Sequence, residues 1–261
     1  IVTKYPAPAV RPMNPALLLG FMWIAYFLNY ADRQAVFAMF PALKADLGMS
    51  DDQLGMVGSA FLWVYAVGCP IAGQLADRWS KRTLAVASLA IWSVVTFCTG
   101  LAAGPVSLLL LRMAMGVSES LFMPGAIALT ANAHAPHLRS RAIAILTTAQ
   151  IVGTIGGSVA GGWMADRGQW RTAFFCLGAI GLLYALPYLR FLRTLPEALD
   201  RSDSTHTRSG LALPVLVRSR SFLVLCTIFP VFLFGLWLLY GWLPAFLHDK
   251  FQLNQTKAAW N

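Results

Sequence analysis

The chain has 261 residues, of which 57% are hydrophobic and only 12% are charged. Soluble domains carry about 25% charged residues, so this composition excludes an ordinary soluble domain and indicates a membrane protein. The net charge of +9 requires no nucleic-acid partner, because the basic residues cluster at the ends of long apolar runs, where membrane proteins carry them.

Seven apolar runs are each long enough to cross a bilayer, which takes roughly 20 helical residues. The first run is too long for a signal peptide and lacks a small-residue cleavage site. The seven predicted transmembrane helices cover residues 16–41, 54–76, 83–103, 106–131, 142–164, 171–192 and 221–247. We therefore expect an all-α, multi-pass protein of a cell membrane, with the bacterial inner membrane as the expected location.

The basic residues predict the orientation of these helices. With the N-terminus in the cytoplasm, thirteen of the twenty Lys and Arg residues fall in cytoplasmic segments, five in outer segments and two within helices. Cytoplasmic loops carry an excess of Lys and Arg, so this distribution predicts a cytoplasmic N-terminus. It argues against a seven-helix receptor, whose N-terminus lies outside. The lysines all lie outside the predicted helices, which argues against a retinal protein.

Four ionisable residues interrupt the apolar runs: Asp32 and Arg33 in the first helix, and Arg112 and Glu119 in the fourth. Each would cost about 2.5–3.5 kcal/mol at the centre of a lipid-exposed helix, so we expect all four to face the bundle interior. Neighbouring residues point about 100° apart around a helix, so Asp32 and Arg33 are expected to serve different partners. Arg112 and Glu119 lie roughly 10 Å apart along one face and need a bridging group to communicate.

The chemistry of these four residues fits coupled transport of an anion. A carboxyl group in a dehydrated interior can bind and release a proton near neutral pH. An arginine stays charged and grips a carboxylate with two parallel hydrogen bonds. We interpret Asp32 and Glu119 as proton-coupling residues, Arg33 as a substrate-binding residue and Arg112 as part of the charge network. The alternative is a static ion-pair network that only holds the two helices together.

A repeated motif organises the first six helices. The sequence GQLADR at 73–78 returns as GWMADR at 162–167, three helices later and on the opposite face, as an inverted-topology repeat of three plus three helices predicts. We expect a six-helix bundle in residues 1–192, a cytoplasmic linker in 193–220 and the first helix of an incomplete second bundle in 221–261. The chain lacks an initiator Met and is expected to be truncated.

Three glycines recur every fourth residue in the fifth predicted helix, at Gly153, Gly157 and Gly161. Small residues at this spacing let two membrane helices approach closely. We therefore interpret the stripe as a packing surface rather than as a binding site.

Several segments resemble a known family of transporters. GQLADRWSKR (73–82) resembles the loop signature of the major facilitator superfamily, G-x-x-x-D-R-x-G-R-R/K, and RMAMGVSES (112–120) is similar to its helix 4 motif. NYADR, SAFLWVY and TTAQIVG resemble the anion:cation symporter branch, which includes sugar-acid:proton symporters. Spinster-like transporters carry a similar Asp-Arg pair and helix 4 Glu, so they remain an alternative.

The resemblance implies the major facilitator fold and transport by alternating access. It also implies that Tyr30, Tyr65 and Gln150 contact a sugar-acid substrate, whose hydroxyl groups suit phenol and amide side chains. Ordinary interhelical hydrogen bonding is the alternative for these three residues.

The loop signature implies a conformational latch on the cytoplasmic face. The residues of this latch are Gly73, Asp77, Arg78 and Arg82. Two departures from the family motifs matter. Ser80 stands where the signature has Gly, which weakens the match at a tight turn but leaves the charges. Ser158 stands where the antiporter-type motif has Pro, which favours symport.

The predicted function is secondary active symport of a small organic anion, such as a sugar acid, with protons as the coupling ion. A lysolipid or drug exporter on the same fold is the alternative. We expect a monomer in the lipid bilayer without cofactor or metal. An enzyme is not expected, because the four histidines lie in loops or at helix ends and the four cysteines sit singly in separate apolar helices.

Overall fold

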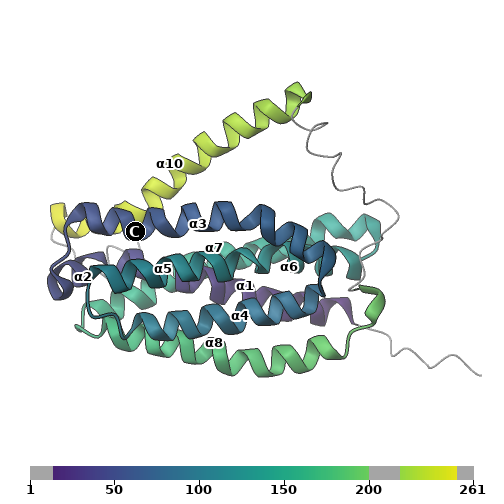
Figure 1. The fold of residues 1–261 in the computed structure, drawn as a ribbon, viewed down its shortest axis with the longest axis horizontal. Helices are drawn as coiled ribbons and strands as arrows, with labels where there is room; N and C mark the ends of the chain where they lie inside the picture. Colours follow the sequence, from purple (N-terminus) through teal and green to yellow (C-terminus); the bar gives the residue numbers. More distant parts are fainter. Residues whose placement is uncertain (1–13, 200–217, 252–261) are drawn as a thin grey trace, which may run out of the picture.

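The computed structural model describes residues 14–199 and 218–251, and within these ranges most of the chain is helical (Figure 1). The longer helices are α1 Pro15–Ala38, α2 Phe40–Leu47, α3 Asp51–Arg78, α4 Lys81–Thr99, α5 Pro105–Ser120, α6 Phe122–Ala133, α7 Arg139–Ala165, α8 Trp170–Arg193 and α10 Arg220–Phe251. Two short 3₁₀ turns lie at Pro136–Leu138 and Glu197–Leu199. The seven predicted helices are all present.

Two of the predicted helices are divided, and a proline explains each break. The fourth is split at Leu121 into α5 and α6. Pro124 has no N–H to bond the carbonyl of Ser120, four residues earlier, and its ring crowds that carbonyl. The first predicted helix ends at Ala38, and Pro41 lies at the start of the short helix α2 that follows. The sequence had predicted one continuous helix in both places.

Side chains fix the starts of α3 and α4. Ser50 caps α3 by accepting a hydrogen bond from the Gln53 N–H at 3.2 Å, and Gln53 Oε1 accepts one from the Ser50 N–H at 3.0 Å. Ser80 caps α4 by accepting from the Thr83 N–H at 3.2 Å. Ser80 replaces the glycine of the loop signature, so its hydroxyl gives this position a capping role that glycine lacks.

Five described segments are long and apolar enough to cross a membrane by length and composition. These are Asp51–Ala76, Lys81–Thr99, Pro105–Ala133, Pro136–Ala165 and Trp170–Arg193. α1 is not among them, and its second half buries Asn29, Asp32, Arg33 and Gln34. Large apolar side chains such as Trp63 and Leu183 are exposed on the outside of the bundle, as expected of side chains that face lipid.

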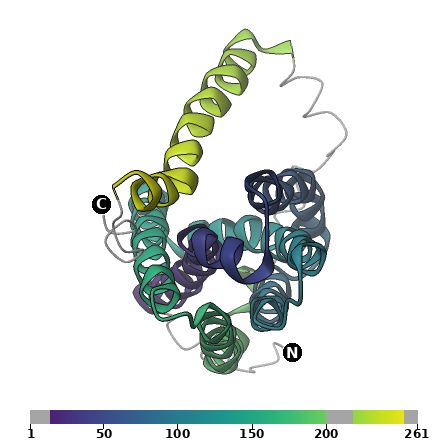
Figure 2. The same cartoon turned by 90° about the vertical axis from the view of Figure 1, so that its left-hand side faces the viewer.

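The helices pack with the symmetry of an inverted repeat. α1, α3 and α4 form the first repeat, and α5–α6, α7 and α8 form the second. The most extensive contacts join α1 to α7, α4 to α8 and α3 to α5, and the end view shows these helices gathered in one bundle from which α10 projects (Figure 2). In the two repeats α1 corresponds to α5–α6, α3 to α7 and α4 to α8. The symmetry therefore relates the α1–α7 contact to the α5–α3 contact and relates the α4–α8 contact to itself. The three-plus-three arrangement is therefore confirmed.

The glycine stripe of α7 lies against the backbone of α1. A Cβ atom added at Gly153 would come within 2.6 Å of the Phe27 carbonyl oxygen, and one at Gly157 within 2.3 Å of the Ala31 oxygen. Both distances are far below van der Waals contact, so only glycine permits this approach. The predicted packing role of the stripe is confirmed.

Two apolar clusters fill the bundle, one on each side of the buried charges. One includes Met22, Trp92 and Phe122, in the half that holds the start of α1. The other includes Phe40 and Phe174, in the half that holds α2. α10 touches the bundle at that second end, where Trp242 packs edge-on against Phe40 with ring centroids 5.7 Å apart. The start of α10 lies away from the bundle (Figure 1).

Candidate functional site

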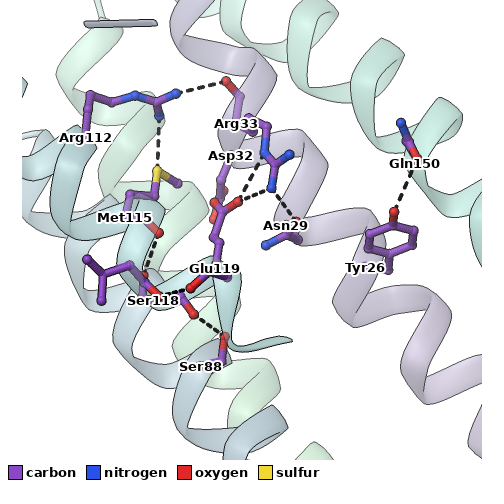
Figure 3. Close-up of polar contacts among 12 residues, drawn as sticks. Tyr26, Asn29, Asp32, Arg33, Ser88, Arg112, Met115, Ser118, Glu119 and Gln150 are labelled. Carbon is purple, nitrogen blue, oxygen red and sulfur yellow. Dashed lines mark hydrogen bonds and ion pairs between the residues drawn. The ribbon is translucent and has the colours of Figure 1, made fainter. Parts of the chain in front are cut away.

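A buried ion pair joins α1 to α5 between the two apolar clusters. Nε and Nη2 of Arg33 both donate to one oxygen of Glu119, Oε2, at 3.1 and 2.5 Å. Nη2 of Arg33 also donates to Asn29 Oδ1 at 3.3 Å (Figure 3). The side chains of Arg33 and Glu119 are 3% and 0% exposed. The pair thus connects the first helices of the two repeats in a fully desolvated setting.

Asp32 points to a different neighbour from Arg33, as the sequence predicted. Its Oδ2 accepts a hydrogen bond from Thr96 Oγ1 of α4 at 3.2 Å, and the residue is 1% exposed. Within the described ranges no hydrogen-bond donor reaches Asp32 Oδ1 or Glu119 Oε1. Each buried carboxyl group therefore has one oxygen that protein donors leave unsatisfied, which is costly for a charged carboxylate.

Arg112 reaches the ion pair through the backbone. Its Nη2 donates to the carbonyl oxygen of Arg33 at 3.4 Å and its Nη1 contacts Met115 Sδ at 3.1 Å. The side chain is fully buried. The sequence predicted that Arg112 and Glu119 need a bridging group, and Arg33 occupies that position: its side chain bonds Glu119 and its carbonyl accepts from Arg112.

Three aromatic rings surround the guanidinium of Arg33. Its Cζ lies 4.5 Å from the ring centroid of Tyr30, 4.7 Å from that of Phe61 and 4.8 Å from that of Tyr65. We call these three rings the aromatic cage. Two of them, Tyr30 and Tyr65, are residues that the resemblance assigned to substrate. Here both lie against Arg33.

Gln150 lies beside this site on α7. Its Oε1 accepts a hydrogen bond from the hydroxyl group of Tyr26 at 3.2 Å (Figure 3). Tyr26 packs edge-on against Tyr30, with ring centroids 5.1 Å apart. Sequence reasoning missed Tyr26 and Asn29. The available signal was their spacing, because residues three to four apart share a helix face: Asn29 precedes Arg33 by four residues, and Tyr26 precedes Asn29 by three.

The structure describes only part of the predicted latch. Arg82 donates through Nη1 to the Leu195 carbonyl at 2.9 Å and through Nη2 to the Pro196 carbonyl, so it binds the end of α8 within the same bundle. Gly73 faces open space. The side chains of Asp77 and Arg78 lie outside the described part of the chain, and the latch stays a prediction.

A second polar contact ties the opposite end of the bundle. Asp46 of α2 accepts hydrogen bonds from Arg171 Nη1 and, at 3.1 Å, from Trp170 Nε1. The Arg171 hydrogen bond, followed by that of Trp170, lowers the pKa of Asp46 below its usual value. Arg171 Nη2 also donates to the Ala102 carbonyl at 3.1 Å. These bonds join α2, the α4–α5 loop and α8.

Two inverted three-helix repeats joined by a desolvated ion pair define a membrane transport protein. Among the described residues no group of three or more His, Cys, Asp or Glu side chains gathers closely enough to hold a metal ion. A family model described as Major Facilitator Superfamily matches residues 22–260. The chain therefore belongs to this superfamily, whose members are transporters rather than enzymes.

Curated relatives include transporters of organic acids. The chain is 27% identical to the hexuronate transporter of Bacillus subtilis over 239 residues, covering 88% of this chain and 56% of that protein. It is 31% identical to the "Probable sulfoacetate transporter" of Cupriavidus necator over 260 residues, covering 92% and 59%. It is 29% identical to human protein spinster homolog 1 over 256 residues, covering 95% and 48%. The chain thus spans about half to three fifths of the length of these relatives.

A solved structure shares the fold. It is a bacterial homolog of the human lysosomal transporter spinster in an inward-facing, unoccupied conformation. It superposes with a TM-score of 0.77 at 23% identity, over 98% of this chain and 59% of that one. The inward-facing, occupied conformation gives a TM-score of 0.75 at 24% identity. Similarity at this level of identity concerns the fold alone.

Proposed function

We propose that the protein is a secondary active transporter that moves a small organic anion together with protons by alternating access. The proposal rests on the ion pair between Arg33 and Glu119. Glu119 is a carboxylate held on a buried guanidinium, and a substrate carboxylate offers the same chemical group to the same donors.

This geometry supports coupling between the proton and the substrate. When Glu119 takes up a proton it loses its charge, and its hold on Arg33 weakens because charge-assisted hydrogen bonds are roughly twice as strong as neutral ones. Arg33 then has donors available for an incoming carboxylate. Asp32, buried nearby against Thr96, is the second proton-coupling residue in this scheme, and Arg112 adds positive charge that favours an anion.

The polar groups around Arg33 suit a hydroxylated acid. Tyr30 and Tyr65 lie on the guanidinium, and Gln150 presents an amide one side chain away, beyond Tyr26. Phenol and amide groups can both donate to and accept from hydroxyl groups. Relatives named for hexuronate and for galactarate or glucarate transport support the same substrate class.

The test is uptake by the full-length protein reconstituted into liposomes. Hexuronate, galactarate and sulfoacetate are supplied outside with an inward proton gradient, and proton entry is followed with a trapped pH dye. We expect concentrative uptake of at least one acid with stoichiometric proton entry. Acid uptake that does not depend on the proton gradient, or proton entry that does not increase when any of the acids is added, would contradict the proposal.

A lysolipid or drug exporter is the second candidate, and one surface favours it. An apolar groove of about 390 Å³ lies between α3 and α5, lined by residues that include Trp63, Val67, Ile71 and Val117. Such a groove suits an acyl chain. In the same liposomes a fluorescent lysolipid would then be moved while the acids are not, and this outcome would replace the organic-anion proposal.

We further propose that the N-terminus is cytoplasmic. The start of α1 lies at the same end of the bundle as the starts of α4 and α7 and the end of α8 (Figure 1). The residues at these helix ends include Arg82, Arg139, Arg141, Arg190 and Arg193, and cytoplasmic ends are enriched in such residues. With the four native cysteines replaced, labelling a single cysteine introduced at Arg139 or at Gly168 with an impermeant reagent in intact cells tests this orientation. We expect label at Gly168 alone.

A further inference from the structure

The ring of Phe61 lies against two buried guanidinium groups. Its ring centroid lies 4.7 Å from Cζ of Arg33 on α1 and 5.0 Å from Cζ of Arg112 on α5. Phe61 is itself on α3 and 1% exposed. One aromatic ring from a third helix therefore contacts both cations at once.

The backbone is built to bring Phe61 to this place. A Cβ atom added at Gly116 of α5 would meet the Phe61 carbonyl oxygen at 2.8 Å. Because that distance is below contact, the missing side chain at Gly116 lets α3 approach α5 at this level. Gly116 lies one turn from Arg112 and from Glu119 along α5, so the close approach coincides with the charged residues.

The charges explain what a ring contributes here. Arg33 has a carboxylate partner in Glu119, whereas Arg112 has contacts to a thioether and to a carbonyl. Two guanidinium groups close together in a desolvated bundle repel each other. An aromatic face attracts a cation through its quadrupole, and it does so without occupying any N–H donor. The donors of Arg33 stay available for a carboxylate.

We propose that Phe61 is a positioning residue that holds Arg33 in place while its carboxylate partner changes, and that stabilises the second cation, Arg112, beside it. The proposal rests on the proposed role of Arg33 in binding the substrate anion. A polar residue at position 61 would compete for the donors of Arg33, and an aliphatic residue would leave the two cations without this attractive aromatic surface.

Stepwise fluorination of Phe61 tests the proposal, since each fluorine weakens the ring quadrupole and changes its volume little. Mono-, di- and trifluorophenylalanine are introduced at position 61 of the full-length protein. We measure KM and maximal rate of proton-driven hexuronate uptake, and the Kd of hexuronate for the purified protein. We expect KM and Kd to rise stepwise, to about tenfold with three fluorines, while the maximal rate stays within twofold.

Phe174 supplies the matched control. It is 1% exposed, in the apolar cluster on the α2 side, and the same fluorinated series there should leave Kd unchanged. Flat Kd values across the Phe61 series, or equal effects at Phe61 and Phe174, would overturn the proposal. Hexuronate binding without proton-driven uptake in the wild type would refute the proposed function while the Kd series still decides on Phe61. A wild type that binds none of the three acids would refute both.

Discussion

Arg82 at the start of α4 and Arg171 at the start of α8 lie 89 residues apart. Each donates to at least one backbone carbonyl oxygen just after the end of the other's helix. Arg82, the second residue of α4, bonds the carbonyls of Leu195 and Pro196 after α8. Arg171, the second residue of α8, bonds the carbonyl of Ala102 after α4. The offset equals that of the repeated motif, so the inverted repeat ties the α4–α8 pair once at each end of the bundle.

Each arginine should therefore slow backbone hydrogen exchange only in the segment whose carbonyls it binds. Hydrogen exchange of the purified protein, read by mass spectrometry, should show segment 192–199 exchanging about tenfold faster in Arg82→Gln, because bonds from a charged donor contribute roughly 1.5–3 kcal/mol. Segment 100–104 should be unchanged. In Arg171→Gln the pattern should reverse, with a smaller effect because Arg171 is 40% exposed and solvent weakens its bonds.

Arg167→Gln is the control for both variants. Arg167 ends the second copy of the motif, four residues before Arg171, but it donates to the Trp163 carbonyl of the neighbouring helix α7 and stacks on the Trp163 ring. It should leave both segments unchanged. Equal acceleration at both ends in Arg82→Gln would mean that the arginine acts on global stability, and the assignment of two local ties would fail.

The buried carboxyl groups should be required for proton coupling. Asp32→Asn and Glu119→Gln should each abolish uptake driven by a pH gradient, because an amide cannot take up and release a proton in this range. Glu119→Gln should retain counterflow exchange of substrate, since it resembles the protonated form. Asp52→Asn, in the exposed first turn of α3, is the control. Full concentrative uptake by Asp32→Asn or Glu119→Gln would remove that residue from the mechanism.

Arg33→Lys should weaken binding of the acid. Lysine keeps the charge but loses the planar fork that reaches a carboxylate with two donors. We expect KM for a hydroxylated carboxylate to rise about tenfold, roughly 1.4 kcal/mol. In a second measurement, a neutral sugar of the same shape should compete poorly with the acid for uptake by the wild type. Arg190→Lys, exposed in the last turn of α8, should change nothing. An unchanged KM, or equal competition by the neutral sugar, would favour the exporter.

The sequence predicted the helices, the repeat and the glycine stripe because each depends on a local pattern. Apolar runs of about 20 residues and small residues at every fourth position remain visible without knowledge of any neighbour. The sequence also placed Asp32 and Arg33 in the bundle interior. The cost of a charge in lipid leaves them no other position.

The partners within the site could not be predicted in the same way. Spacing along α1 separates Asp32 from Arg33, but the choice of Glu119 for Arg33 depends on the depth and rotation of α5. Phe61 is an apolar residue within an apolar run, so its residue type did not distinguish it from its neighbours. Only the structure shows that its ring lies against Arg33. The acceptors of Arg82 are backbone carbonyls, which any sequence would supply.

The Asp46 contact should make stability depend on pH in the acid range. Its pKa in the folded state is lowered, whereas an unfolded Asp titrates near about 3.9. The contribution is therefore fully present above that value and is lost as pH falls through the lower, folded pKa. In detergent, Asp46→Asn should lower the thermal midpoint at pH 6, and the difference from wild type should vanish at the acid end.

Arg171→Gln should lose the same pH-dependent part, since it removes the first cause of the shift, and should keep a pH-independent loss from the hydrogen bond to the Ala102 carbonyl. In the double variant the two losses should not add, as for any two residues of one contact. Additive losses, or a difference between Asp46→Asn and wild type that persists at the acid end, would show that Asp46 acts through something other than its charge.

Gly157→Ala should disturb both stability and transport, because the added Cβ would lie 2.3 Å from the Ala31 oxygen and 2.6 Å from its Cα. These are backbone atoms, so α1 and α7 must separate, at a cost of about 1–3 kcal/mol for overpacking. The shift passes directly to Asp32 and Arg33, the next residues on α1. We expect a lower thermal midpoint and reduced uptake.

Gly156→Ala is the matched control for Gly157→Ala. Its new Cβ would meet only the Phe27 ring at 3.3 Å, which can turn aside, and alanine favours the helix. Equal behaviour of the two variants would show that the stripe tolerates side chains and that helix contact does not place the charged pair.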